Sequence, residues 1–322
     1  MTRAGYTALP VYYDRWQKSY GKDYSTLIAP RFYATLQRYQ VPVSTFADVG
    51  CGTGTLALML AQRGWKGFGL DASEGMIREA RAKVSGSDGH VQFLQQDMRT
   101  FTLPGPVRVI SALFDVMNHL TRLRDLNATL RAVHRGLLPS GLFIFDTNNE
   151  HCFTTIWNKT ETIEHRDFTI ILHNTYLPAR RLARCHVTIL PKQDLRAHRE
   201  QEVVRERCYT RDEMTETLAA AGFRVLEGED FNFTGGPGVG DLKTWWVAQK
   251  SKLHKTFVPH RLVRITHKTE RHEHFTQGVE GGARAVTHLD VDGADGAKVH
   301  GEPGEAEQRT HGITHECTGR IV

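Results

Sequence analysis

A short glycine-rich segment, D-V-G-C-G-T-G-T at residues 48–55, is the feature that most restricts how this chain can fold. The apolar run 45–49 leads into it, and an apolar pattern with helical spacing continues from Thr55 to Arg63. Glycines between a strand and a helix let a ligand approach the backbone closely. The segment therefore predicts a ligand site where a buried strand ends and a helix begins.

Further apolar runs alternate with helical patterns after this segment. Strands are expected at 67–71, 91–97, 107–113 and 141–147, and helices at 73–84 and 122–138. Apolar, β-branched strands that alternate with helices indicate a parallel sheet covered on both faces. We therefore expect an α/β fold, with a Rossmann-like, doubly wound, mostly parallel seven-stranded sheet and an antiparallel β insertion after the fifth strand.

The chain divides into five predicted segments. Residues 1–44 are rich in tyrosine and are expected to form an N-terminal helical lid, and residues 45–150 form the core. Three or four extended runs at 151–208 predict the antiparallel insertion, which would cap the substrate. Residues 209–250 supply a final helix and the strands that complete the core.

Residues 251–322, the fifth segment, differ in composition from the rest of the chain. They hold nine of the 17 histidines, only two aromatic residues, and ten basic and ten acidic residues. So polar a stretch buries little apolar surface, and we expect it to be mostly disordered. His272 and His274 flank Glu273, but no third ligand follows at metal spacing, so no metal site is expected.

The bulk composition indicates a soluble cytoplasmic protein. Hydrophobic residues make up 40% of the chain, and no run approaches the roughly 18 apolar residues of a membrane span. No signal-peptide core is evident, and the five cysteines show no paired spacing, which fits a reducing compartment. The formal charge of +5 is mild and does not require nucleic acid as a partner.

The glycine spacing and the strand ends together select among cofactors. A nicotinamide dinucleotide site has the pattern G-x-G-x-x-G, and Thr55 stands where its third glycine would be needed. A phosphate-binding loop needs a lysine after the glycines, and none follows here. Asp71 and Asp97 end two neighbouring strands, where open parallel sheets bind their ligands. These carboxylates suit the ribose diol and the adenine amine of the sulfonium cofactor S-adenosylmethionine.

Four motifs occur in the order and with the spacing typical of one family. They are D-V-G-C-G-T-G-T (48–55), G-L-D-A-S-E-G-M-I (69–77), F-L-Q-Q-D-M-R-T-F (93–101) and G-L-L-P-S-G-L-F-I-F-D (136–146). Over roughly residues 10–250 the chain resembles class I S-adenosylmethionine-dependent methyltransferases, which implies that fold, cofactor and activity. The cofactor-binding residues implied are Tyr24, Asp48, Gly50, Cys51, Gly52, Gly54, Asp71, Ala72, Met76, Asp97, Met98 and Phe114.

The resemblance also implies which part of the cofactor each residue would contact. The glycines lie under its methionine part, whose carboxylate would be bound by Tyr24. Asp71 takes the ribose hydroxyls, Met76 lies near the adenine, and Asp97 takes the adenine amine with the Met98 backbone beside it.

The acceptor is predicted from the segment after the fourth strand, L-F-D-V-M-N-H-L at 113–120. It lacks the paired prolines of methylases that act on adenine or glutamine. Among small-molecule methyltransferases the chain resembles amino-sugar N,N-dimethyltransferases, through Tyr13-Asp14, residues 21–24, the N-H-L triplet and G-G-P-G-V-G-D at 235–241. That last loop lacks the arginine found in the family. The predicted acceptor is an amine, or a hydroxyl, of a small molecule.

Methyl transfer is expected to be an in-line displacement that depends mainly on alignment of the two reacting atoms. An imidazole that titrates near neutrality makes His119 the first candidate for the proton acceptor, and Tyr13 would orient the acceptor. Asn118 and His151 are further candidates. A histidine that merely fixes the loop and a tyrosine that merely packs the lid are the competing interpretations.

Three other functions remain open at this point. A tRNA or other nucleic-acid methyltransferase would need a basic patch, and the basic run 122–135 lies on a predicted sheet-packing helix. A methyltransferase fold could also bind a cofactor or partner without turnover, and a dehydrogenase is the remaining alternative. A monomer or homodimer is expected, with no nucleic-acid or membrane partner.

Overall fold

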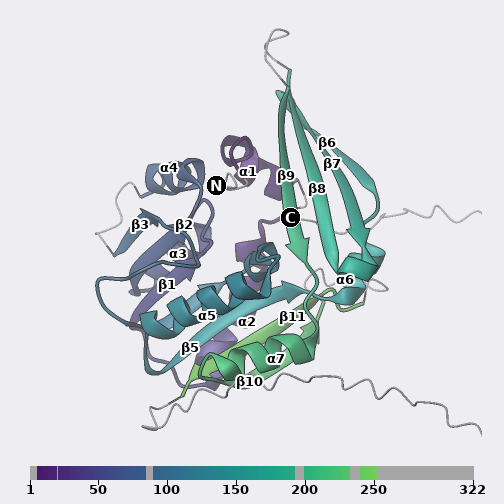
Figure 1. The fold of residues 1–322 in the computed structure, drawn as a ribbon. Coiled ribbons are helices and arrows are strands. Elements are labelled where there is room, and N and C mark those ends of the chain that lie inside the picture. The colour runs from purple at the N-terminus through teal and green to yellow at the C-terminus, as the bar shows by residue number, and fades with distance from the viewer. Residues whose placement is uncertain (1–5, 20, 85–89, 193–198, 233–239, 252–322) are drawn as a thin grey trace, which may run out of the picture. The chain divides into compact units, whose positions relative to one another are not determined.

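The computed structural model describes residues 6–19, 21–84, 90–192, 199–232 and 240–251. Its larger sheet has seven strands in the order β10-β11-β5-β4-β1-β2-β3 (Figure 1). The strands are β1 (Thr45–Val49), β2 (Lys66–Asp71), β3 (Val91–Gln95), β4 (Val107–Ala112), β5 (Leu137–Asn148), β10 (Phe223–Phe231) and β11 (Lys243–Lys250). β1 to β5 run parallel, and β11 is antiparallel to both β5 and β10. This is the predicted class I fold, and its sheet is mostly parallel as expected.

Helices cover both faces of the sheet. They are α2 (Tyr24–Arg38), α3 (Thr55–Ala61), α4 (Glu74–Ala82), α5 (Leu123–Gly136) and α7 (Arg211–Ala220). Successive side chains of a strand point to opposite faces of the sheet. Phe46 therefore packs in one apolar cluster with α2, α3 and α4, and Ala47 packs in another with α5 and α7. Figure 1 shows α5 and α7 side by side on the second face. The carboxyl ends of the parallel strands are thereby left for a ligand.

The insertion after β5 is a separate antiparallel sheet of four strands. It consists of β6 (Thr160–Glu164), β7 (Phe168–Leu177), β8 (Leu182–Pro191) and β9 (Glu200–Arg207), in that order. Short helices flank it: α1 (Pro10–Lys18), α6 (Glu150–Thr155), and the 3-10 turns η1 (Val116–His119) and η2 (Pro178–Arg180). One face of this sheet packs against α1 and α6 in a third apolar cluster. Figure 1 shows α1 close to the N-terminus.

The element boundaries differ from the prediction mainly at β5. The predicted strand 141–147 begins instead at Leu137, directly after α5. The predicted lid contains two helices, α1 and α2, and α1 contacts α4 beyond β2. Most of the loop 235–241 and of the predicted tail 251–322 lies outside the described residues. No helix of the described part is long and apolar enough to cross a membrane.

Candidate active site

A cavity of about 620 Å³ lies over the carboxyl ends of β1 to β4. The N-terminal segment contributes Tyr6 and Tyr13 to its wall, and β9 contributes Val203, Val204 and Arg205. Eight residues predicted to bind the cofactor line it: Gly50, Gly52, Asp71, Ala72, Met76, Asp97, Met98 and Phe114. The predicted catalytic residues His119 and Tyr13 line the same cavity, so the fold brings both groups together.

A smaller cavity, about 50 Å³, lies beside the glycine loop and shares Tyr13, Gly50, Gly52 and Phe114 with the first. The predicted residues Tyr24, Asp48 and Cys51 line this part alone. Gly54 lines neither cavity, and a Cβ on it would lie 2.6 Å from the ring of Phe93. Gly54 therefore allows α3 to pack on β3, and its predicted contact with the cofactor is not supported.

Asp71 holds the glycine loop and the start of α4 together. Its Oδ2 accepts a hydrogen bond from the Gly52 N–H at 2.9 Å, and its Oδ1 accepts one from the Ser73 N–H at 2.8 Å. Burial raises the pKa of Asp71, while these backbone donors oppose that rise. Each carboxylate oxygen has a second lone pair, so the carboxylate can also accept hydrogen bonds from a diol.

Asp97 lines the large cavity but already has a partner that the sequence did not reveal. The Arg99 Nε donates to Oδ1 at 2.9 Å and to Oδ2 at 3.0 Å, and the Arg99 N–H donates to Oδ1 at 2.9 Å. Hydrogen bonding from Arg99 lowers the pKa of Asp97, so this carboxyl stays ionised. Arg99 orients Asp97 at the cavity wall, and no pattern in the sequence indicated this pairing.

Asp48 lies deeper, beneath the small cavity. Its Oδ1 accepts a hydrogen bond from the Ser111 Oγ of β4 at 2.7 Å. Burial raises the pKa of Asp48 to about 7, and the Ser111 hydrogen bond counteracts part of this rise. The side chain therefore changes protonation near neutral pH.

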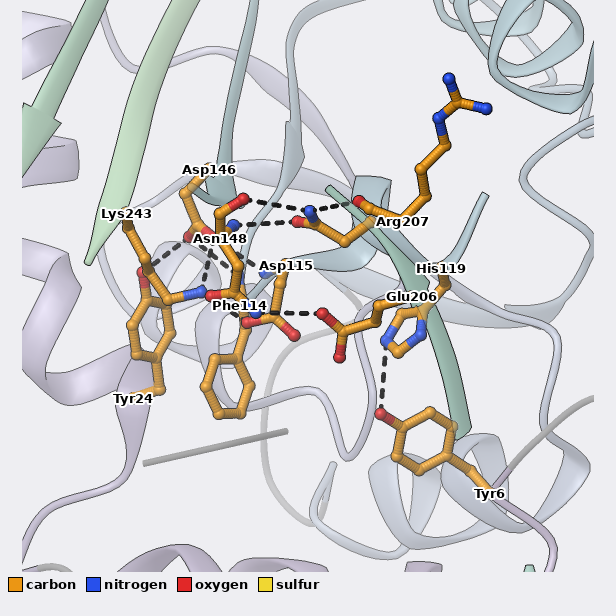
Figure 2. Close-up of polar contacts among 11 residues, drawn as sticks. Tyr6, Tyr24, Phe114, Asp115, His119, Asp146, Asn148, Glu206, Arg207 and Lys243 are labelled. Atoms are coloured by element: carbon orange, nitrogen blue, oxygen red, sulfur yellow. Dashed lines mark hydrogen bonds and ion pairs between the residues drawn. The ribbon is translucent and has the colours of Figure 1, made fainter. Parts of the chain in front are cut away.

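The hydrogen bonding of Tyr24 does not support its predicted role. Its hydroxyl donates a 2.6 Å hydrogen bond to Oδ2 of Asp146 at the end of β5 (Figure 2). A phenol has one proton to donate, and this bond uses it, so none remains for a cofactor carboxylate. Asp146 also accepts the N–H groups of Phe114 and Asp115, both at 2.8 Å. Tyr24 thus belongs to a hydrogen-bonded support of the loop after β4.

That loop has an unusual backbone. Phe114 and Asp115 have φ angles of 72° and 54°, in the left-handed region that few non-glycine residues adopt. The two hydrogen bonds to Asp146 compensate for this strain. The ring of Phe114 also stacks on the ring of Tyr24, with centroids 4.4 Å apart. The loop is therefore held firmly where η1 begins.

Asn118 is fully buried and supports the loop instead of facing the cavity. Its Nδ2 donates to the carbonyls of Asn148 and Arg207, at 3.2 and 2.9 Å, and its Oδ1 accepts from the Asn148 N–H at 2.9 Å. The amide is fully used in joining η1 to β5 and β9, so its predicted catalytic role is not supported. His151 is exposed on α6 and also lines neither cavity.

His119 lines the cavity in a defined orientation. Its Nδ1 lies 3.4 Å from the Arg205 carbonyl and its Nε2 lies 3.3 Å from the Tyr6 hydroxyl. With the proton on Nδ1, the imidazole donates to Arg205 and accepts from Tyr6. Burial lowers the pKa of His119 to about 4, so the ring is neutral at physiological pH. The expectation that it titrates near neutrality is wrong, because the ring is desolvated.

Several residues around the cavity were missed in the sequence. Tyr6 is the clearest example, because it contacts His119, which lies 113 positions later in the sequence. Asp115, Glu206 and Lys243 are also buried beside the loop after β4. Glu206 lies in the polar run 200–207, where no alternation of apolar residues marks which positions face inward. Contacts between segments so distant in sequence carry no local signal.

Residues 46–141, from β1 to the first half of β5, match the family of methyltransferase domains. This part of the chain is a methyltransferase domain, and the chain has the fold of class I S-adenosylmethionine-dependent methyltransferases. A relative from Bacillus subtilis (strain 168), YqeM, provisionally named a methyltransferase, is 28% identical over 208 residues, which cover 64% of this chain and 83% of YqeM. The dTDP-3-amino-3,6-dideoxy-alpha-D-glucopyranose N,N-dimethyltransferase of Streptomyces fradiae is 27% identical over 221 residues, covering 66% and 82%.

Solved structures agree on the fold of this methyltransferase. An S-adenosylmethionine-dependent methyltransferase from Clostridium acetobutylicum ATCC 824 superposes with a TM-score of 0.64 at 18% identity, covering 75% of this chain and 97% of the other. The family match is to a methyltransferase domain, so the dehydrogenase alternative has no support.

The cavity of this methyltransferase fits S-adenosylmethionine, its cofactor. Gly50 and Gly52 have φ angles of 68° and 53°, and both line the cavity. A Cβ on Gly52 would approach only the ring of Tyr13, at 3.8 Å, among the described residues. Its backbone is therefore open to a ligand. Acidic Asp71 and Asp97 on the same wall suit the cofactor's hydroxyl and amine donors.

Proposed function

We propose that this methyltransferase transfers a methyl group to an amine of a small molecule. The observation that carries the proposal is the continuity of the large cavity. It extends from Asp71 and Asp97 to Tyr6, Tyr13 and His119 without a break. One end can hold a cofactor, and the other is lined by Tyr6, Tyr13 and His119 together with β9 of the insertion.

For the cofactor end, we assign each part of S-adenosylmethionine to the chain's own residues. Asp71 accepts from the ribose hydroxyls, Asp97 with the Met98 backbone binds the adenine amine, and Met76 packs beside the adenine. The open backbone of Gly52, with Gly50 beside it, accommodates the methionine part. When bound, the cofactor supplies an electrophilic methyl group on its sulfonium.

At the acceptor end, His119 favours an amine over a hydroxyl. A hydroxyl is a poor nucleophile unless a strong base removes its proton. The low pKa of His119, about 4, makes the imidazole too weak a base for that task. A neutral amine attacks without prior deprotonation, so it needs only a hydrogen-bond acceptor, such as the hydroxyl oxygen of Tyr6, to orient its N–H. Tyr6 and Tyr13 then form the aromatic walls that position the acceptor.

The relatives and the cysteines support two further parts of the proposal. The Streptomyces fradiae relative is named as an N,N-dimethyltransferase of a dTDP-amino sugar, so amino sugars are the first acceptors to test. Cys51, Cys152, Cys185 and Cys208 are free thiols in the described part, which fits a cytoplasmic location. We expect a monomer or homodimer without a nucleic-acid partner.

A paired acceptor screen tests the proposal. The purified enzyme is incubated with S-adenosylmethionine and with amino sugars, each matched by the analogue that carries a hydroxyl in place of the amine. Mass spectrometry then follows methylation of each. We expect methylation of an amine and none of its hydroxyl partner. Methylation of hydroxyl analogues alone, or of RNA with steep salt dependence, would overturn the proposal.

A further inference from the structure

A group of buried charges lies behind the acceptor end of the cavity. Asp115 follows β4, His119 ends η1, and Glu206 lies on β9 of the insertion, with its carboxylate between the other two side chains in the view of Figure 2. Asp115 is 1% exposed and Glu206 is 0% exposed. Two segments that are far apart in the sequence, 115–119 and β9, thus converge on one point.

The partners of these groups leave two acceptor atoms unused. Glu206 Oε2 accepts from the Asn148 Nδ2 at 3.0 Å, and Asp115 Oδ1 accepts from the Lys243 ammonium. The other two oxygens, Asp115 Oδ2 and Glu206 Oε1, have no hydrogen-bond donor among the described residues. A buried carboxylate oxygen without a donor is strongly disfavoured, so these atoms indicate an additional positively charged or donating ligand.

The charges around this point are also unbalanced. Asp115, Asp146 and Glu206 are carboxylates, and Lys243, which pairs with Asp115 and Asp146, is the ammonium between them. Formally the group has an excess of two negative charges when His119 is neutral. A divalent cation would balance it.

The geometry suits a single ion. One ligand atom from each of Asp115, His119 and Glu206 lies within 4.8 Å of the others. Two ligands on opposite sides of an ion with bonds of about 2.1 Å are about 4.2 Å apart, so only small movements are needed. The Nδ1 of His119 faces the Arg205 carbonyl, an arrangement that commonly orients a metal-binding histidine. Its Nε2 is then the ligand atom, and the Tyr6 hydroxyl, now 3.3 Å from Nε2, would give up its hydrogen bond to that nitrogen when an ion binds.

We propose that Asp115, His119 and Glu206 bind a divalent first-row transition-metal ion. Two carboxylates and one imidazole suit Mn²⁺, Fe²⁺ or Zn²⁺, since these ions accept both oxygen and nitrogen ligands. The ammonium group of an acceptor fits less well, because Asp115 and Glu206 do not line the cavity and their free oxygens are buried. His119 does line the cavity, which gives an ion a path to the site.

Manganese binding by the full chain tests this site directly. The protein is treated with a chelator and titrated with Mn²⁺, and free Mn²⁺ is followed by electron paramagnetic resonance. Histidine is a common metal ligand and residues 251–322 hold nine of them, so the comparison is made between variants that retain this segment. Glu206→Gln removes a ligand charge, and Glu202→Gln is its matched control on the same strand and the same face of the sheet.

We expect one Mn²⁺ site in the wild type and in Glu202→Gln, with affinity at least about tenfold weaker in Glu206→Gln. Circular dichroism and thermal unfolding report whether each variant is folded. If Glu206→Gln does not fold, His119→Ala on the cavity wall replaces it, with the same expected loss. Equal Mn²⁺ binding in all variants would overturn the proposed site. No Mn²⁺ binding in the wild type would also overturn it and would indicate that the two carboxyls share a proton instead. No methyl acceptor is used, so the result is independent of the proposed amine specificity.

Discussion

The hydroxyl of Tyr24 donates a 2.6 Å hydrogen bond to Oδ2 of Asp146 and joins helix α2 to the end of strand β5. The same carboxylate accepts the N–H groups of Phe114 and Asp115. A residue of the N-terminal segment therefore fixes the loop that carries His119. The position of the acceptor end thus depends on contacts made outside the cavity.

Tyr24→Phe is predicted to reduce stability more than cofactor binding. It removes a buried hydrogen bond to a carboxylate, which should cost about 1.5–3 kcal/mol of unfolding free energy. Urea unfolding measures that loss, and calorimetry with S-adenosylhomocysteine measures affinity. If Tyr24 instead binds the methionine carboxylate, affinity will fall while stability stays close to that of the wild type.

Asp71→Ala is predicted to weaken S-adenosylhomocysteine binding by about 1.5–3 kcal/mol, because charge-assisted hydrogen bonds to the ribose are lost. Calorimetry measures the change. Glu74→Gln, an exposed residue at the start of α4, is the control and should bind normally. An unchanged affinity in a folded Asp71→Ala protein would remove Asp71 from the cofactor site.

Asn118→Ala is predicted to lower the unfolding free energy by about 1–3 kcal/mol, since it leaves buried backbone groups of Asn148 and Arg207 without partners. The folded variant should retain the wild-type affinity for S-adenosylhomocysteine. Parallel unfolding and binding titrations test both statements. A catalytic role would instead appear as lost turnover at unchanged stability.

The low pKa of His119 makes stability depend on pH in a definite direction. The pKa is about 4 in the folded protein and about 6.5 in the unfolded chain, so the unfolded state binds more protons between these values. The contribution of neutral His119 to the unfolding free energy is therefore fully present above pH 6.5. It is lost as the pH falls towards 4. By pH 5.5 the loss should reach about 1.4 kcal/mol. Unfolding of wild type and His119→Asn at pH 7.5 and 5.5 measures it, and equal pH dependence in both proteins would contradict it.

The cofactor end of the site could be predicted from the sequence, because it depends on the local pattern of strands and helices. Strand–helix alternation placed Asp71 and Asp97 at neighbouring strand ends, and both line the cavity. The residues around the acceptor could not be predicted in this way. Tyr6 meets His119, and Glu206 approaches Asp115, only because the insertion and the N-terminal segment fold over the sheet. Likewise, the desolvation that lowers the pKa of His119 arises only from that packing.

A crystal structure with S-adenosylhomocysteine bound tests the central claim most directly. The account predicts the ribose hydroxyls on Asp71, the adenine amine at Asp97, and the sulfur directed towards the space between Tyr13 and His119. A cofactor bound elsewhere, or bound here with its sulfur directed away from His119, would contradict the account.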